Sequence, residues 1–161
     1  MSKTLVVYYS AQGHTKRIAE KVAENLGADI FEIVPEEIYS EADLDWTNDD
    51  ARATREHDED MRDVPLTSTE VPGWENYDIV ILGYPIWWGV SAWATDAFVK
   101  AVDWNGKTVY PFCTSHSSGL GDSDILLREQ ANGGDWKDGF RFFQDATDET
   151  ISKWTDTLDK A

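Results

Sequence analysis

The small and polar residues at positions 10–15, which read SAQGHT, are the first in the chain whose types and spacing could do chemistry. They follow an apolar run and come directly before a helical pattern, so several backbone N–H groups and the positive end of a helix dipole point at one place. The hydroxyls of Ser10 and Thr15 add donors, and Gly13 lets the backbone approach closely. The pattern predicts a phosphate monoester site. On this loop alone, a strand, loop and helix that bind nothing are an equally good interpretation.

Two adjacent tryptophans form a second candidate. Trp87 and Trp88 follow the apolar run at residues 79–82. Neighbouring side chains on an extended backbone point in different directions, so we expect at most one indole to face the core. The other would offer a flat surface to a ligand ring. Pro85 and Gly89 favour a turn here, although both indoles could also pack beneath the loops as ordinary apolar filling.

A third candidate lies at residues 113–123, which read CTSHSSGLGDS. Its small polar residues and glycines are Thr114, Ser115, Ser117, Ser118, Gly119 and Gly121. They suit a hydrogen-bonding rim better than a core, and backbone N–H groups there could reach the carbonyl oxygens of a polar heterocycle. Taken alone, a plain connection is the simpler interpretation.

Alternating strand and helix patterns must position these loops. Apolar runs lie at residues 5–9, 30–34, 79–82 and 108–112, with a weaker run at 136–143 that Gly139 interrupts. The first and third are nearly continuous, as in strands buried on both faces of a parallel sheet. Helical periodicity separates the runs, at residues 14–27, 93–102, 123–132 and 147–160.

This alternation predicts an α/β fold with a doubly wound parallel sheet and helices on both faces. The length of 161 residues suits a single domain over residues 1–161. Ligands of such sheets bind beyond the carboxyl ends of the strands. The three candidate loops should therefore converge into one site.

The chain is strongly acidic, with a net charge of −17 from 31 acidic and 14 basic residues. This charge repels nucleic acid and anionic membranes and favours a basic protein partner, although it could equally reflect the salt habit of the host. Residues 36–63 hold twelve acids against three arginines. We expect residues 36–73 to form a solvated acidic excursion, with loops and one helix near 48–62 that covers one edge of the sheet.

Other patterns exclude several classes of protein. Cys113 is the one cysteine, so no intrachain disulfide is possible, and we expect a buried, inert thiol in a cytoplasmic protein. No apolar stretch reaches the roughly 20 residues of a membrane span. The three histidines lack the spacing of metal ligands, and we expect no metal. The GKT at residues 106–108 precedes an apolar run, whereas a phosphate-binding P-loop follows one.

The three loops together resemble those of the flavodoxin-like FMN-binding family, in its short-chain branch. The matching segments are YYSAQGHTKRIAE, ILGYPIWWG and YPFCTSHSSGLGDS, which occur in the family's order over essentially the whole chain. The resemblance implies a five-stranded sheet with strand order 2-1-3-4-5, FMN as cofactor and a redox function.

The resemblance also implies roles for individual residues. The phosphate would be held by Ser10, Gln12, Gly13, His14 and Thr15. One side of the isoalloxazine would be lined by Pro85, Ile86, Trp87, Trp88 and Gly89, and the other edged by Thr114, Ser115, His116 and Gly119. The chain departs from the best-known carriers at His14, where those often have asparagine. Its third loop also lacks the tyrosine that commonly stacks on their flavin, and His116 could instead donate a hydrogen bond or titrate near neutral pH.

An electron-transfer protein of low potential is the function that the resemblance favours. Carboxylates and the cofactor phosphate would disfavour further negative charge on the flavin. Redox proteins with a basic docking surface would be the partners, and the chain would be a monomer or a weak dimer without catalytic residues of its own. An FMN-dependent NAD(P)H:quinone or flavin reductase is the alternative. A non-redox binder of phosphate ligands, or an acidic interaction domain, is a third.

Overall fold

The computed structural model describes residues 3–10, 14–36, 39–40, 42–44, 47–48, 50–58, 65–87, 90–115, 123–131, 133–137, 139–143 and 146–158. Its strands are β1 (Thr4–Tyr8), β2 (Asp29–Glu32), β3 (Ile79–Trp87), β4 (Val90–Ser91), β5 (Thr108–Ser115), β6 (Asp135–Trp136) and β7 (Phe140–Phe143). Its α-helices are α1 (His14–Leu26), α2 (Arg52–Asp58), α3 (Trp93–Ala101), α4 (Ser123–Gln130) and α5 (Asp148–Thr157). Short 3-10 helices lie at Ala42–Leu44 and Trp74–Asn76.

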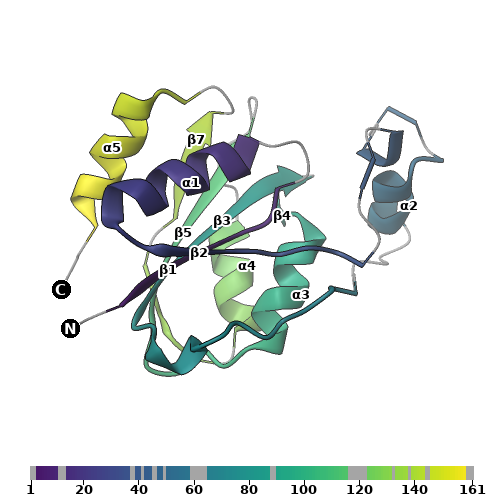
Figure 1. Ribbon diagram of the computed structural model, residues 1–161. Coiled ribbons are helices and arrows are strands. Elements are labelled where there is room, and N and C mark those ends of the chain that lie inside the picture. The colour runs from purple at the N-terminus through teal and green to yellow at the C-terminus, as the bar shows by residue number, and fades with distance from the viewer. Residues whose placement is uncertain are drawn as a thin grey trace.

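The strands form one twisted, mainly parallel sheet (Figure 1). β1 lies between β2 and β3, and β5 lies on the far side of β3. β6 pairs with the start of β5 and β7 with its end, so the two together occupy the fifth position. The predicted strand order 2-1-3-4-5 is confirmed, with two additions. The fifth strand is split around Gly139, and the short β4 folds back antiparallel on β3.

Helices cover both faces of the sheet, as the alternating pattern predicts (Figure 1). On one face, Ile18 of α1 and Trp154 of α5 pack with Val6 and Ile81 of the strands. On the other face, Phe98 of α3 and Leu127 of α4 pack with the alternate strand residues, among them Val7, Val80 and Leu82. The odd and even residues of β1 and β3 therefore enter opposite layers of core, which is why these strands read as continuous apolar runs.

Two strands extend further than their apolar runs predict. β3 continues to Trp87 and β5 continues to Ser115. The pairing between them continues to Pro85 and Thr114. β4 then pairs with the end of β3, and β7 pairs with the end of β5. The extensions are therefore held by backbone pairing with neighbouring strands together with the burial of Tyr84 and Cys113.

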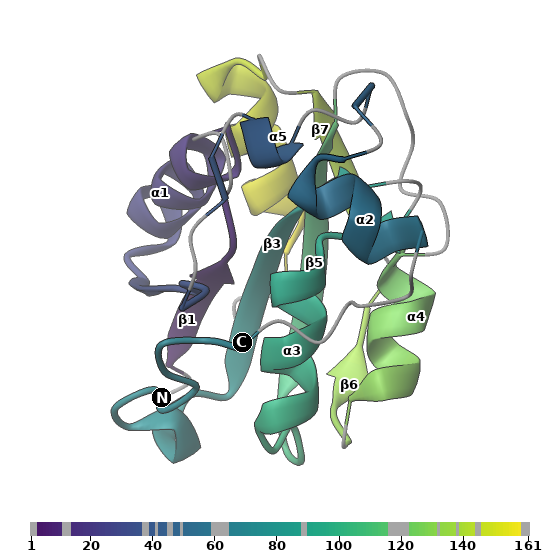
Figure 2. The same ribbon diagram turned by 90° about the vertical axis from the view of Figure 1, so that its right-hand side faces the viewer.

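The acidic excursion lies elsewhere than predicted. Its base is closed by hydrogen bonds from Glu36 N to Pro65 O (2.9 Å) and from Thr67 N to Val34 O (2.8 Å). Its helix α2 does not cover an edge of the sheet but lies beyond the carboxyl ends of the strands, on the side of α3 (Figures 1 and 2). Ala53 of α2 is buried in the same core group as Tyr9 and Trp93. Burial of Ala53 in this core group thus helps to hold α2 at this position.

The GKT segment leads into β5 through a turn, whereas a phosphate-binding P-loop would follow a strand. Gly106 has a φ of 81°, which a glycine adopts without strain. Lys107 is buried, and its Nζ donates to the carbonyl oxygens of Trp74 (2.7 Å) and Tyr77 (2.6 Å). Burial lowers the pKa of this lysine. Its role is therefore to hold the short helix before β3 against the start of β5.

Cys113 is fully buried in β5, as expected for an inert thiol. Across the described parts of the chain, no helix combines the length and apolar character that crossing a membrane requires.

Candidate functional site

The carboxyl ends of β1, β3 and β5 lie next to one another, so the segments that follow them begin at a common edge. Tyr9, directly after β1, donates its backbone N–H to the carbonyl oxygen of Gly83 in β3 (3.0 Å). The hydroxyl oxygens of Thr15 in α1 and Thr114 in β5 are 2.7 Å apart. Hydrogen bonds on either side of the first loop therefore connect it to β3 and β5, the strands that lead to the other two loops.

The first loop leads directly into α1, which begins at His14 and runs for 13 residues. Gln12 and Gly13 lie outside the described residues. Ser10 is half-buried and lines a cavity of about 70 Å³ together with Tyr9, Tyr39 and residues 32–35. His14 is likewise half-buried at the first position of the helix. The structure thus places a helix N-terminus where the sequence predicts a phosphate.

Thr15 has a partner that the sequence could not reveal. Its side chain is buried, and its hydroxyl shares a hydrogen bond with that of Thr114. A hydroxyl has one hydrogen to donate and can accept two. Thr15 can therefore donate to a ligand only when Thr114 donates within the pair, so the two residues act as a unit.

The second loop is the end of a β-hairpin. Ile86 pairs with Ser91 and Trp87 with Val90, and Ala92 donates its N–H to the carbonyl oxygen of Pro85 (3.0 Å). The side chains of Pro85 and Ile86 are half-buried. Trp88, Gly89 and the side chain of Trp87 lie outside the described residues, so the predicted indole surface stays a prediction.

The third loop begins later than predicted. Thr114 and Ser115 belong to β5 and are buried, because β7 pairs alongside them. They end the strand at the common edge instead of forming an exposed rim. His116 and Gly119, with Ser117, Ser118 and Gly121, lie outside the described residues.

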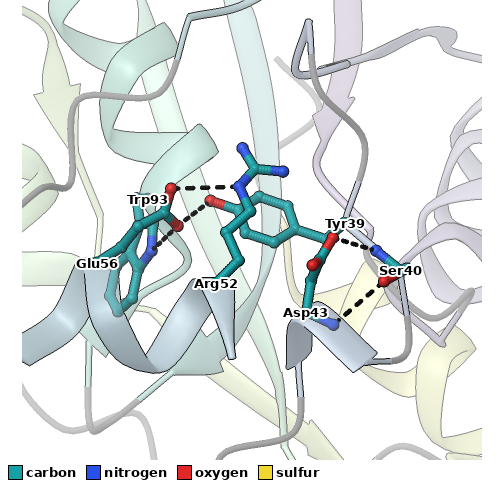
Figure 3. Close-up of polar contacts among 6 residues, drawn as sticks. All are labelled: Tyr39, Ser40, Asp43, Arg52, Glu56 and Trp93. Carbon is teal, nitrogen blue, oxygen red and sulfur yellow. Dashed lines mark hydrogen bonds and ion pairs between the residues drawn. The ribbon is translucent and has the colours of Figure 1, made fainter. Parts of the chain in front are cut away.

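A cluster of polar and aromatic side chains lies beside the second loop and was missed in the sequence (Figure 3). Its centre is Glu56 of α2. Glu56 Oε1 accepts hydrogen bonds from Tyr39 Oη (2.5 Å) and from Trp93 Nε1 (3.1 Å). Glu56 Oε2 accepts from Arg52 Nε (3.3 Å), and the Arg52 guanidinium lies 3.8 Å from the centre of the Tyr39 ring.

Burial keeps the side chains of Tyr39 and the neighbouring Tyr9 protonated. Burial raises the pKa of Tyr39 well above its ordinary value, and the hydrogen bond to the Glu56 carboxylate raises it further. Burial likewise raises the pKa of Tyr9, with Arg52 acting in the opposite direction. Tyr39 is therefore a hydrogen-bond donor to Glu56 at any physiological pH.

The sequence contains one weak indication of this cluster. Arg52 and Glu56 have the i, i+4 spacing of a helical ion pair. They lie among twelve acids, where such a pair is typical of a solvated surface. Only the position of α2 against Trp93 reveals that Glu56 is mostly buried.

No group of three or more histidine, cysteine, aspartate or glutamate side chains is arranged to hold a metal ion within the portion of the chain that the structure describes.

Comparison with known proteins places the chain in a family. The family model described as flavodoxin matches residues 3–158. A candidate flavoprotein from Bacteroides uniformis is 35% identical, with a TM-score of 0.89 and coverage of 97% of this chain and 99% of that chain. A candidate flavoprotein from Bacteroides eggerthii is also 35% identical, with a TM-score of 0.86 and coverage of 97% of each chain.

A more distant structure shows the same fold with a ligand. It is a Lactobacillus acidophilus flavoprotein in complex with FMN, 23% identical, with a TM-score of 0.70 and coverage of 96% of this chain and 99% of that chain. The search of curated proteins found no match. The family match over nearly the whole chain agrees with the observed strand order and with the helices on both faces of the sheet. This chain belongs to the flavodoxin family.

Proposed function

We propose that this protein binds FMN at the carboxyl edge of its sheet and carries electrons between redox proteins. The observation that supports this most directly is the hydrogen bond between Thr15 and Thr114, which are 99 residues apart in the chain. It joins the start of α1 to the end of β5. The proposed phosphate loop and the start of the third loop are thereby held at one edge.

The donor set suits a phosphate without needing a cation inside the loop. Residues 10–15 contain no lysine or arginine. Arg17, close by in α1, donates to the carbonyl oxygen of Ala146 (2.8 Å). Backbone N–H groups at the start of a 13-residue helix, with the hydroxyls of Ser10 and Thr15, would hold the anion. Gln12, Gly13 and His14 complete the proposed phosphate-binding set.

The flavin ring would lie between the second and third loops. Pro85, Ile86, Trp87, Trp88 and Gly89 are the residues proposed for one side, and Thr114, Ser115, His116 and Gly119 for the other. FMN supplies the redox chemistry when bound, since it takes up and gives up electrons. The residues of the chain bind it, orient it and limit the access of water.

Charge favours a carrier over a reductase. A nicotinamide dinucleotide is a polyanion, and a protein with a net charge of −17 repels it at long range. The same charge steers a basic protein toward the site and raises its association rate. We therefore infer that the electron donor and acceptor are proteins with basic docking surfaces.

Titration of the apoprotein with FMN and with riboflavin tests the cofactor and the phosphate loop together. Two charge-assisted hydrogen bonds of about 1.5 kcal/mol each make FMN bind about 100-fold more tightly than riboflavin. Equal affinities would contradict the role given to residues 10–15.

A turnover assay tests the carrier role separately. The FMN-loaded protein is mixed with NADH or NADPH and a quinone, and nucleotide oxidation is followed by absorbance. We expect no turnover above free FMN. Rapid turnover would establish the reductase instead.

A further inference from the structure

The geometry points to Glu56 as a positioning residue that holds the flavin loop, residues 85–93, in place from the acidic excursion. This inference rests on the proposed function, because it takes residues 85–93 as the loop beside the flavin. Glu56 is far from this loop in sequence and belongs to a segment whose composition predicts only a solvated surface. In the structure, however, Glu56 is mostly buried and its carboxylate accepts three hydrogen bonds.

The loop is held at two points. At its base, Ala92 N donates to Pro85 O, which closes the hairpin. One residue later, Trp93 begins α3 with a fully buried indole, whose Nε1 donates to Glu56 Oε1 at 3.1 Å. Thr95 N in turn donates to Ala92 O at the first turn of α3. The direction in which the loop leaves the sheet therefore depends on where Glu56 holds Trp93.

Glu56 is itself held firmly enough to serve as an anchor. Its side chain is 16% exposed, and its carboxylate accepts from Tyr39, Trp93 and Arg52 (Figure 3). A carboxylate taken out of water is destabilising unless donors and a cation compensate it. Here two neutral donors and a guanidinium do so. Arg52 lies on the same helix as Glu56, Tyr39 lies near the start of the excursion and Trp93 begins α3, so Glu56 joins the excursion to the start of α3.

The same cluster also reaches the first loop. Tyr9 and Tyr39 line one small cavity with Ser10. Tyr9 leads directly into the phosphate loop, and it shares its core group with Trp93 and Ala53 of α2. The cluster thus lies between the first two of the converging loops. Because Glu56 bonds directly to Trp93 and adjoins the first loop only through the tyrosines, a change at Glu56 is expected to act more on the loop beside the ring than on the phosphate contacts.

Two tryptophan variants test this inference. Trp93→Phe removes the donor to Glu56, and Trp104→Phe is the matched control at the other end of α3. Trp104 is also fully buried, and its Nε1 donates to Val99 O (2.9 Å). Both variants lose a buried indole, so both lower the melting temperature of the apoprotein. Trp93→Phe alone is expected to weaken FMN and riboflavin binding, by up to about tenfold each, because the loss of one hydrogen bond to a charged group limits how far the loop can be destabilised.

The midpoint potential of the bound flavin is the second measurement. We expect it to shift in Trp93→Phe and to stay constant in Trp104→Phe. A merely structural role would lower both melting temperatures and move neither potential. Equal binding and equal potentials in the two variants would therefore overturn the inference.

A pair of variants at Glu56 gives an independent test. In Glu56→Gln the amide oxygen still accepts from Tyr39 and Trp93, and only the contact to Arg52 is lost. In Glu56→Ala all three contacts are lost. We expect Glu56→Gln to restore most of the FMN affinity that Glu56→Ala loses. An affinity as low in Glu56→Gln as in Glu56→Ala would argue against positioning through Trp93.

Hydrogen exchange of the apoprotein separates this inference from the proposed function. The Ala92 amide, bonded to Pro85 O, is expected to exchange faster in Trp93→Phe than in Trp104→Phe. A wild type that binds no FMN would refute the proposed function, and the exchange experiment would still decide whether Glu56 positions the loop. If the wild type binds FMN and the Ala92 amide exchanges equally fast in Trp93→Phe and Trp104→Phe, only the positioning role is refuted.

Discussion

Two hydroxyl groups illustrate how single residues join distant loops here. Thr15 and Thr114 are 1% and 2% exposed, and each is the hydrogen-bond partner of the other. A buried hydroxyl that loses its partner costs about 1–3 kcal/mol. The pair is therefore both a structural link and, through Thr15, part of the proposed phosphate site.

Substitution of either threonine separates these two roles. Thr15→Val and Thr114→Val break the same hydrogen bond with little change in shape, so each is expected to lower the free energy of unfolding by about 1–3 kcal/mol. Only Thr15→Val removes a hydroxyl from the phosphate loop. The preference for FMN over riboflavin should fall in Thr15→Val and persist in Thr114→Val, as measured by urea unfolding and ligand titration. A preserved preference in both variants would remove Thr15 from the phosphate site.

At the scale of elements, the close approach of β3 and β5 depends on one glycine. Gly83 lies opposite Phe112 in the register, and a Cβ at Gly83 would come within 2.2 Å of the Phe112 ring. The carbonyl oxygen of Gly83 also accepts from Tyr9 N, at the entry to the phosphate loop. The ring of Phe112 is packed with Phe142 and Trp154, so it has little room to move.

Gly83→Ala is accordingly expected to destabilise the fold by about 1–3 kcal/mol, as overpacked cores do. Phe112→Leu makes room for the added methyl group. The double variant should therefore be more stable than the sum of the two single effects predicts, which a double-mutant cycle of thermal unfolding measures. If the destabilisations of the two single variants simply add in the double variant, the Phe112 ring is not the cause of the strain.

At the scale of the whole molecule, self-repulsion among the acids opposes folding. The net charge is −17, and several of the described ion pairs, such as Lys153–Glu149, are on the surface, where such pairs contribute little. Salt shortens the range of this repulsion, from about 30 Å at 0.01 M to about 3 Å at 1 M.

The melting temperature is expected to rise when NaCl is raised from about 0.01 M to about 1 M, in line with that screening range. Differential scanning calorimetry of the apoprotein measures this rise, and sucrose serves as an uncharged control. A melting temperature that falls with NaCl would mean that attractive ion pairs outweigh the repulsion.

The free energy of unfolding should fall steeply with rising pH in alkaline solution. Tyr8, Tyr9, Tyr39 and Tyr77 all have a raised pKa, chiefly through burial, and that of Tyr8 rises to about 12. Above pH 10.0 the unfolded chain releases these protons while the native state keeps them. The free energy of unfolding therefore falls as pH rises, by up to about 1.4 kcal/mol per pH unit for each tyrosine.

Lys107 acts in the opposite direction, because its pKa is lowered and its unfolded form binds the additional proton up to about pH 10.5. One such group does not offset four tyrosines. Urea unfolding between pH 9 and pH 12 should show the decline, at roughly one proton per buried phenol. In Tyr8→Phe the decline should be shallower. An equal slope in wild type and variant would mean that Tyr8 does not titrate with unfolding.

The order of elements could be predicted because each carries its own pattern. Ile18, Val22 and Leu26 repeat at helical spacing in α1, and the continuous run at residues 79–82 indicates a strand buried on both faces. The strand ends could not be predicted in the same way. Thr114 and Ser115 are polar, and they are extended because β7 pairs with both of them and β3 pairs with Thr114.

The candidate site also has a part that could be predicted from the sequence and a part that could not. The sequence alone determined the class of fold and predicted which three loops follow strands that end at one edge, because local periodicity and loop chemistry depend on neighbours in the chain. The tertiary structure decided that Thr15 pairs with Thr114, that α2 lies beyond the strand ends, and that Glu56 holds Trp93. These contacts join residues tens of positions apart, and local periodicity carries no information about such partners.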